Sequence, residues 1–332
     1  MKTFFQTLLL ALLPTALLAH DTWLVPAAFR ATPGQPVRLR LATSEAFPMS
    51  DVAASPDRIA RFTLRTASGT QAVEGYRVEG KFLIADATPA QPGHAIVVAE
   101  TKSRAFVLQP KVFNQYLQEE GLEAALAARA RKGQTDSAGR ERYRKIAKTI
   151  LCVGEPNDAL YAEAEGLWLE IVPERSPCGL HAGEALRVRV TFEGRPLAGA
   201  HLGAGYAGVT GHSYPVWLLT DPEGRATVPL DRSGIWFVRV LHMVAAEQDA
   251  EADWHSAFST LTFEVHPQAA GAEAELRALL HAQAEAWNRG DIEGFMQGYW
   301  KSDRTTFAGS SSPTWRSRHW SLMQLWSWGT GS

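Results

Sequence analysis

Short segments in which apolar and polar residues alternate recur along the first third of the chain, and they limit the fold more than any other feature. In "VRLRLAT" (37–43), the apolar side chains of Val37, Leu39 and Leu41 occur at every second position. A period of two places them on one face of an extended strand, whereas a helix needs a period near 3.6. "RFTLRT" (61–66) repeats the pattern, and turn residues separate such segments. Short alternating strands joined by turns are typical of an antiparallel β-sandwich.

A turn in the third quarter of the chain supports the same architecture. "TDPEGRATVPL" (220–230) contains Pro222, whose ring fixes φ at the first turn position, and Gly224, which allows the turn to close tightly. A strand, such a turn and a following hairpin recur in immunoglobulin-like and transthyretin-like modules. We therefore expect a mainly β chain, with one antiparallel sandwich module over residues 20–110 and a second over residues 155–267.

Between these modules the hydrophobic period changes, which predicts a helical arm over residues 111–154. In "AGRERYRKIAKTILCVG", the side chains of Tyr143, Ile146, Ala147 and Ile150 follow the i, i+3, i+4, i+7 spacing of one helix face. The same part of the chain is rich in basic residues, which we interpret as a solvated helix face.

The first 19 residues have the features of a secretory signal peptide. Lys2 supplies the positive charge, the run that follows is largely apolar, and Ala19 is a small residue of the kind that signal peptidase prefers. The run is shorter than the roughly 20 residues that a membrane helix needs. We expect cleavage between Ala19 and His20, export to the periplasm, and no membrane span in the mature chain. The alternatives are an uncleaved anchor or a cut a few residues away.

Composition excludes one class of partner and leaves one question open. The chain has 33 Lys and Arg against 35 Asp and Glu, so it lacks the broad basic field of nucleic-acid-binding proteins. Its two cysteines, Cys152 and Cys178, would meet an oxidising compartment after export. Both a disulfide between them and two free buried thiols fit the sequence, whereas no cysteine spacing indicates a zinc site.

His20 is the leading candidate for a metal ligand, because cleavage after Ala19 would make it the amino terminus. Its free α-amine loses a proton near neutral pH, and its imidazole Nδ1 reaches the same ion in a six-membered chelate. A second imidazole would complete a set of three nitrogens suited to Cu, Ni or Co. His242 is the first candidate partner, with Asp253 as a further ligand or hydrogen-bond partner, and His212 is the second.

Three classes of function follow from these features. The first is an exported binding or accessory protein that holds a metal ion at His20 and works with another periplasmic or membrane protein. The second is a structural or protein-interaction module without a metal, in which every candidate histidine, including His94, is a surface or capping residue. The third, an enzyme, has the least support because the chain has no HExxH or GxSxG motif and no legible nucleophile triad.

Several motifs together resemble domain-of-unknown-function family 4198 over residues 20–266. They are "AHDTWLVP" at the start, "FNQYLQEEGL" and "GRERYRKIAK" in the middle, and "TDPEGRATVPL" with "DWHSAFSTLTFEV" near the end. The members are exported bacterial proteins that have been linked to periplasmic cobalt or nickel uptake. The resemblance therefore implies export and, as an analogy only, nickel or cobalt.

A second resemblance concerns "AWNRGDIEGFMQGYWKSDRTTF" (286–307), which is similar to the start of the steroid-isomerase-like or nuclear-transport-factor-like superfamily, branch 4440. That fold needs several further strands to close its pocket, and the chain departs from the pattern after Phe307. We expect an incomplete α+β fragment over residues 268–309, in which Asp291 caps a helix, and no catalytic residue is carried over. The tail over residues 310–332 matches neither pattern, and we expect it to be disordered.

Overall fold

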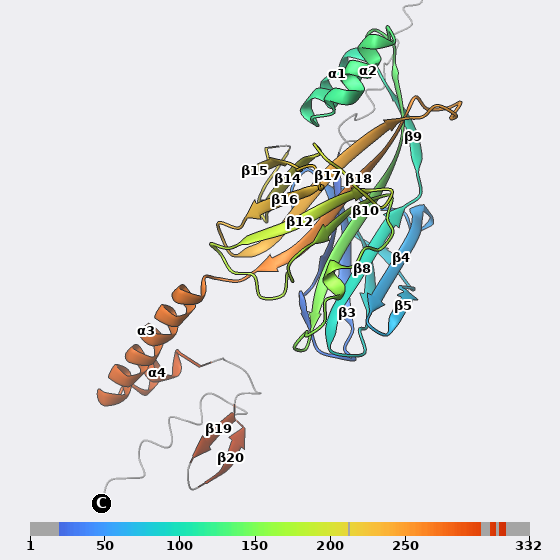
Figure 1. Ribbon diagram of the computed structural model, residues 1–332. Coiled ribbons are helices and arrows are strands. Elements are labelled where there is room, and N and C mark those ends of the chain that lie inside the picture. Colours follow the sequence, from blue (N-terminus) through green and yellow to red (C-terminus); the bar gives the residue numbers. More distant parts are fainter. Residues whose placement is uncertain (1–19, 212, 300–305, 310–311, 317–332) are drawn as a thin grey trace, which may run out of the picture. The chain divides into compact units, whose positions relative to one another are not determined.

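The computed structural model describes residues 20–211, 213–299, 306–309 and 312–316 (Figure 1). The chain divides into two compact units, one ending at His266 and one beginning at Pro267. The described part of the first unit consists mainly of strands in three sheets, and that of the second consists of two helices and a short hairpin.

The strands in the described part of the first unit form three sheets. The first sheet has the order β1-β3-β7-β6, with β1 (Asp21–Pro26), β3 (Val37–Ser44), β7 (Phe82–Ala87) and β6 (Arg77–Glu79). The central sheet follows the path β15 (Val216–Leu219), β14 (His201–Tyr206), β17 (Gly234–Ala245), β18 (Trp254–Val265), β10 (Gly139–Val153), β8 (Gly93–Thr101), β4 (Ile59–Thr66) and β5 (Gly69–Ala72), and β2 (Arg30–Ala31) and β9 (Arg104–Leu108) also pair with β10. The third sheet contains β11 (Leu169–Pro173), β12 (Ala185–Phe192), β13 (Arg195–Pro196) and β16 (Arg225–Pro229).

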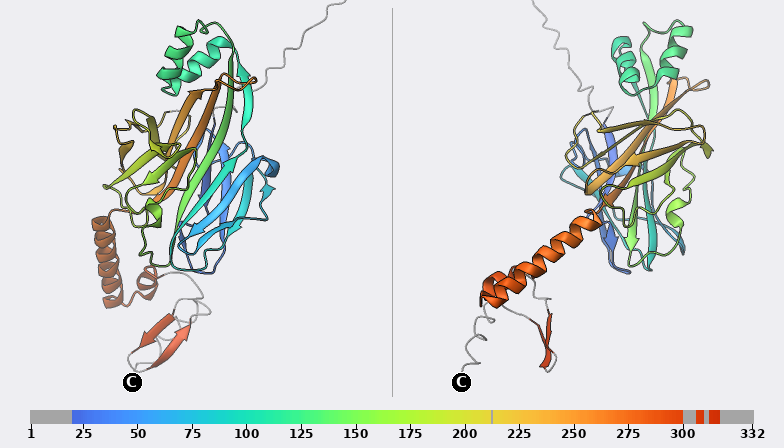
Figure 2. Two further views of the ribbon diagram at one scale, coloured as in Figure 1. Left: turned by 45° about the vertical axis from the view of Figure 1, so that its right-hand side comes forward. Right: turned by 60° about the vertical axis from the view of Figure 1, so that its left-hand side comes forward.

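The central sheet carries a hydrophobic core on each of its faces. Along β10, the side chains of Ile146 and Ile150 pack in one core with residues of the third sheet. Ala147 and Leu151 pack in another core with residues of the first sheet, among them Leu39. The mainly β, sandwich-like architecture predicted from the sequence is therefore confirmed, but the two sandwiches share one continuous sheet and form three layers (Figure 2).

The second half of the predicted helical arm is wrong, because residues 139–153 form the long strand β10. This strand pairs parallel to β18 and antiparallel to β8 and β9. A strand that is buried on both faces has apolar residues on both sides, so the period of two disappears from its sequence. Helix occurs in this part of the chain only in α1 (Pro110–Glu119) and α2 (Glu123–Arg131).

The turn predicted around Pro222 and Gly224 is confirmed. The Gly224 amide donates to the Asp221 carbonyl at 2.9 Å, and Gly224 has a φ of +73°. A Cβ at this position would lie 2.5 Å from the carbonyl oxygen of Val190, so the turn packs against β12 more closely than a side chain allows.

Cys152 and Cys178 form a disulfide. It joins β10 to the segment after β11. Of the two states that the sequence left open, a disulfide and two free thiols, the structure therefore contains the disulfide.

The second unit contains α3 (Ala269–Asn288), α4 (Ile292–Met296) and a hairpin of β19 (Thr306–Gly309) and β20 (Ser312–Arg316). The Asp291 carboxylate accepts a hydrogen bond from the Gly294 amide at 2.8 Å, so its predicted capping role is confirmed. Within the tail that was predicted to be disordered, residues 312–316 instead form β20, and the other residues of the tail lie outside the described part of the chain. None of the helices in the described part of the chain combines the length and the apolar composition that a membrane crossing requires.

Candidate functional site

His20 directly precedes β1 and is buried, with 7% of its surface exposed. The antiparallel register of β1 and β3 pairs Asp21 with Ser44, so His20 lies beside the segment that follows β3. Its Nε2 is 3.3 Å from Oε1 of Glu45, and its Nδ1 is 4.0 Å from Oδ2 of Asp51. We call these three residues the His20 site.

Local hydrogen bonds hold the Asp51 carboxylate and the chain segment between Glu45 and Asp51 in place. The Asp51 amide donates to the Thr43 carbonyl at 2.9 Å, and the Ser44 hydroxyl donates to Oδ2 of Asp51 at 2.6 Å. The Thr43 amide donates to the Ser50 hydroxyl at 3.0 Å. The segment from Glu45 to Asp51 therefore folds back onto the end of β3, which brings both of its acidic ends to His20.

The His20 imidazole is suited to bind a cation. Burial is the main cause that lowers its pKa; Lys145 lowers the pKa further, whereas Glu45 and Asp51 raise it. A neutral imidazole is the form that binds metals. Among the described residues, Nδ1 has no hydrogen-bond partner although it is buried. The 4.0 Å between Nδ1 and Asp51 fits two ligands that each lie about 2 Å from one ion.

Side chains alone do not complete a metal site. Within the described residues, no group of three or more His, Cys, Asp or Glu side chains lies close enough to hold a metal ion. The His20 site offers one imidazole nitrogen and one nearby carboxylate, so a further donor is needed. Cleavage at the predicted position after Ala19 would free the α-amine of His20 and so supply such a donor.

The structure does not bring His242 to His20. On β17, the side chain of Val240 packs in the core with the third sheet, whereas Arg239 points to the opposite face and meets Asp21. Residues two apart on a strand share a face, so His242 lies on the side of the third sheet. Its ring contacts Phe192 at 4.6 Å between centroids, and burial lowers its pKa.

The other two predicted ligands have different surroundings. Asp253 accepts two hydrogen bonds from the Arg140 guanidinium, at 2.7 and 3.0 Å, and these bonds are the main cause that lowers its pKa. His212 lies outside the described residues. The residue before it, Gly211, donates its amide to the Glu45 carbonyl at 2.8 Å.

His94 also lacks a free nitrogen. Its Nδ1 lies 2.8 Å from Oδ1 of Asp158, and its Nε2 lies 2.7 Å from the Ser176 hydroxyl. These contacts leave no nitrogen of His94 for a metal ion.

A buried ionic network beside the His20 site was not foreseen from the sequence. The Arg239 guanidinium donates to Oδ1 of Asp21 at 3.2 Å and to Oε2 of Glu120 at 2.6 Å. The Tyr214 hydroxyl donates to Oδ2 of Asp21 at 2.5 Å, and the Lys145 ammonium donates to the His20 carbonyl at 2.5 Å. Charged hydrogen bonds in a dry interior fix the groups that make them, so this network fixes the start of β1.

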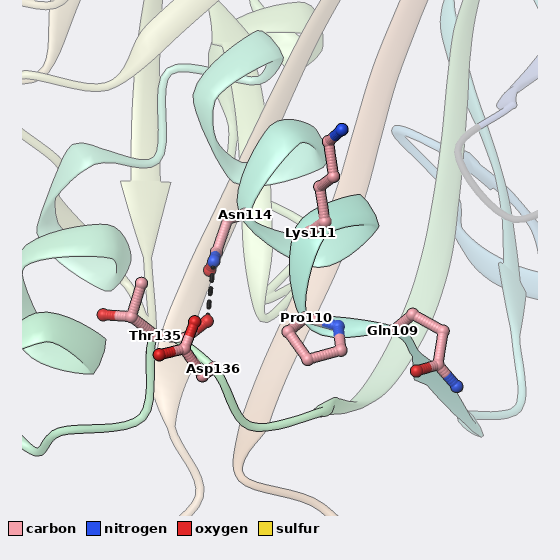
Figure 3. A pocket seen from close by; sticks show the side chains of 6 residues that line it. All are labelled: Gln109, Pro110, Lys111, Asn114, Thr135 and Asp136. Atoms are coloured by element: carbon pink, nitrogen blue, oxygen red, sulfur yellow. Dashed lines mark hydrogen bonds between the residues drawn. The ribbon is translucent and has the colours of Figure 1, made fainter.

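The hollow in Figure 3 is a less suitable site. It has a volume of about 480 Å³ and is lined by Gln109, Pro110, Lys111, Asn114, Thr135 and Asp136. The Asn114 amide donates to the Thr135 carbonyl across it at 2.9 Å. It contains neither a histidine nor a cysteine, and none of the residues predicted as metal ligands lines it.

Several solved structures, among them that of a bacterial adhesin, are weakly similar to this chain. The D0-D1 domain of Intimin is 11% identical, with 73% of this chain and 97% of that chain covered and a TM-score of 0.20. The Escherichia coli adhesin FdeC is 13% identical, with 74% and 65% covered and a TM-score of 0.21. Murine CEACAM1b is 5% identical, with 75% and 100% covered and a TM-score of 0.19. At such TM-scores the likeness carries no argument. Among curated proteins, none matches the chain.

A family match covers most of the first unit. Residues 17–244 match the family described as "Domain of unknown function (DUF4198)", and the matched span contains the His20 site, α1, α2 and all but the last residue of β17. The predicted family is thereby confirmed over residues 17–244. The link of that family to export and to cobalt or nickel uptake stays a prediction, as does the resemblance of residues 286–307 to the nuclear-transport-factor-like superfamily. The chain belongs to the DUF4198 family.

Proposed function

We propose that this chain is an exported accessory protein that binds a transition-metal ion (Cu, Ni or Co) through His20 as its mature amino terminus. The observation that supports this proposal is the Nδ1 atom of His20, which is buried, has no hydrogen-bond partner among the described residues, and lies 4.0 Å from a carboxylate oxygen of Asp51. Buried nitrogens in proteins normally have a hydrogen-bond partner, so a buried nitrogen without one that faces a carboxylate supports an ion bound between the two groups.

Each residue of the site would have a distinct role. Nδ1 and the α-amine of His20 would chelate the ion, and the Asp51 carboxylate would add an oxygen ligand. Glu45, 3.3 Å from Nε2, would keep the ring proton on that nitrogen and fix the ring orientation. The Ser44 hydroxyl bonded to Asp51 would hold the carboxylate at its present angle.

Export is part of the same proposal. The leader with a small residue at position 19 supports cleavage there. The disulfide between Cys152 and Cys178 also supports an oxidising compartment, because disulfides persist mainly in exported proteins.

The test is a metal titration of protein made with its own leader. Intact mass first establishes whether His20 is the mature amino terminus, and calorimetry then measures the affinities for Cu(II), Ni(II) and Co(II). We expect submicromolar binding of at least one ion, and a loss of about 10-fold or more in His20→Ala and Asp51→Asn. His281→Ala is the matched control, because that histidine lies on α3 in the second unit and its side chain is 76% exposed.

Two results would contradict the proposal. One is a mature amino terminus at a position other than His20. The other is binding that is micromolar or weaker and unchanged by His20→Ala.

A second candidate is a protein-interaction module without a metal. Strand β15 lies at one end of the central sheet, and its Trp217 and Leu219 side chains are 39% and 60% exposed. Exposed apolar residues on an edge strand are suited to strand addition by a protein partner. A chain of this kind would bind none of the three ions in the titration above.

A further inference from the structure

Three side chains from separate parts of the first unit form a continuous hydrogen-bonded row. Nε2 of His94 lies 2.7 Å from the Ser176 hydroxyl, and Nδ1 of His94 lies 2.8 Å from Oδ1 of Asp158. We propose that this row makes Ser176 an activated nucleophile that hydrolyses small acyl esters. The proposal is independent of the metal site, since none of the three residues belongs to the His20 site.

The contacts of Asp158 determine which group donates and which group accepts in each hydrogen bond of the row. Its carboxylate accepts hydrogen bonds from the backbone amides of His94 and Leu160, each at 2.9 Å. Burial alone would raise the pKa of Asp158, but these bonds together with the His94 ring lower it. An ionised carboxylate only accepts hydrogen bonds, so the proton of the neutral ring is on Nδ1. Nε2 then accepts the hydrogen bond from the Ser176 hydroxyl, as a general base must.

The surrounding backbone holds these three groups together. Gly93 has a φ of +139°, and a Cβ there would lie 2.4 Å from Oδ2 of Asp158, so the close approach of the carboxylate requires glycine. Cys152 is paired with His94 in the register of β8 and β10. Its disulfide partner, Cys178, follows Ser176 by two residues. The disulfide therefore fixes the serine segment beside the histidine.

The Ser176 side of the row is accessible to solvent. Ser176 is partly exposed, whereas the His94 side chain is only 2% exposed. The Cys178 amide donates to the Ser176 hydroxyl at 3.1 Å, so the backbone that follows Ser176 holds this hydroxyl in place.

The proposed reaction needs no cofactor. Ser176 Oγ attacks the ester carbonyl carbon while its proton passes to Nε2 of His94. The bond from this carbon to the alkoxy oxygen then breaks, and the alcohol leaves with the proton from Nε2. Water attacks the acyl-serine, gives one proton to Nε2, and the carboxylic acid leaves as Ser176 Oγ recovers that proton.

The test uses the intact full chain with its disulfide formed, together with an alkyl fluorophosphonate, from which a nucleophilic serine displaces fluoride. Peptide mass spectrometry should locate the adduct on Ser176, and Ser176→Ala should abolish both the adduct and the hydrolysis of p-nitrophenyl acetate. Ser55 is the internal control, because its exposed hydroxyl donates to the Asp57 carboxylate rather than to a histidine.

A second variant separates catalysis from folding. Asp158→Asn keeps the side-chain shape but removes the charge that orients His94, and we expect labelling of Ser176 to slow by about 100-fold or more. Circular dichroism and the melting temperature check that the variant is folded. Labelling of Ser176 no faster than that of Ser55, or equal labelling of the folded Asp158→Asn protein, would overturn the proposal.

Discussion

Arg239 and Asp21, which are 218 residues apart in the sequence, form an ion pair inside the first unit, with 3.2 Å between Nε and Oδ1. The two side chains are 1% and 2% exposed. Glu120, at the end of α1, accepts a second hydrogen bond from the same guanidinium at 2.6 Å. One buried cation thus connects β17, the helices and the strand that begins next to His20.

Replacing Arg239 with Met should destabilise the protein strongly, because two buried carboxylates would lose their cation. We expect the free energy of unfolding to fall by about 3–5 kcal/mol, measured by urea denaturation. Arg38→Met is the control, since Arg38 pairs with Asp86 at the surface at 3.3 Å and such pairs contribute about 0–1 kcal/mol. Similar losses in the two variants would show that the buried network does not stabilise the fold as described.

Gly224→Ala should cost more stability than Gly194→Ala. The two glycines have φ values of +73° and +74°, so the strain of the backbone conformation is the same in both. A Cβ at Gly224 would lie 2.5 Å from the Val190 carbonyl oxygen, whereas at Gly194 nothing lies within 4 Å. Urea denaturation should show that backbone strain lowers the free energy of unfolding by about 1 kcal/mol in both variants. Gly224→Ala should lose more than this because of the close contact. Equal losses would mean that the turn moves freely away from β12.

Glu141 should make the stability depend on pH. Burial is the main cause that raises its pKa from 4.5 to about 8, so the folded protein keeps a proton that the unfolded chain releases above pH 4.5. Its contribution to stability is complete below about pH 4.5 and is lost as the pH rises to about 8. The free energy of unfolding of Glu141→Gln should therefore rise relative to that of wild type by on the order of 1 kcal/mol per pH unit over this range. Urea denaturation of both proteins at several pH values measures the difference, and a constant difference would contradict the shift.

The disulfide should contribute measurably to stability, because it closes a loop between residues that are 26 positions apart. The chain-entropy relation gives about 3.5 kcal/mol for such a loop. We expect a loss of this size when wild type is denatured with a reductant present. A double variant, Cys152→Ser with Cys178→Ser, should lose the same amount and should not respond to the reductant; a stable, reductant-insensitive wild type would show that the bond does not form.

The sequence allowed the sandwich class to be predicted, because strands such as β3 alternate buried and exposed residues over their first half and keep a period of two there. The turn at Gly224 was predictable for a similar reason, since its chemistry is local. Strand β10 was misread as a helix because it is buried on both faces, where alternation no longer marks a strand.

The sites depend on contacts that no local pattern encodes. Glu45 and Asp51 meet His20 only through the register of β1 and β3 and the folding back of the segment after β3. Ser176 and Asp158 are 82 and 64 residues from His94, so their row has no motif in the sequence. The sequence feature that indicated the His20 site was the predicted cleavage position, which distinguished His20 from the other histidines among the ten in the chain.

The central claim is that the amino terminus of His20 takes part in metal binding, and the most direct measurement compares two proteins that differ only there. One is the mature chain beginning at His20, and the other carries one additional alanine before His20, which displaces the α-amine and leaves every side chain of the site unchanged. Titration with Cu(II), Ni(II) and Co(II) should give an affinity about 10-fold or more higher for the first protein. Equal affinities of the two proteins for all three ions would contradict the account.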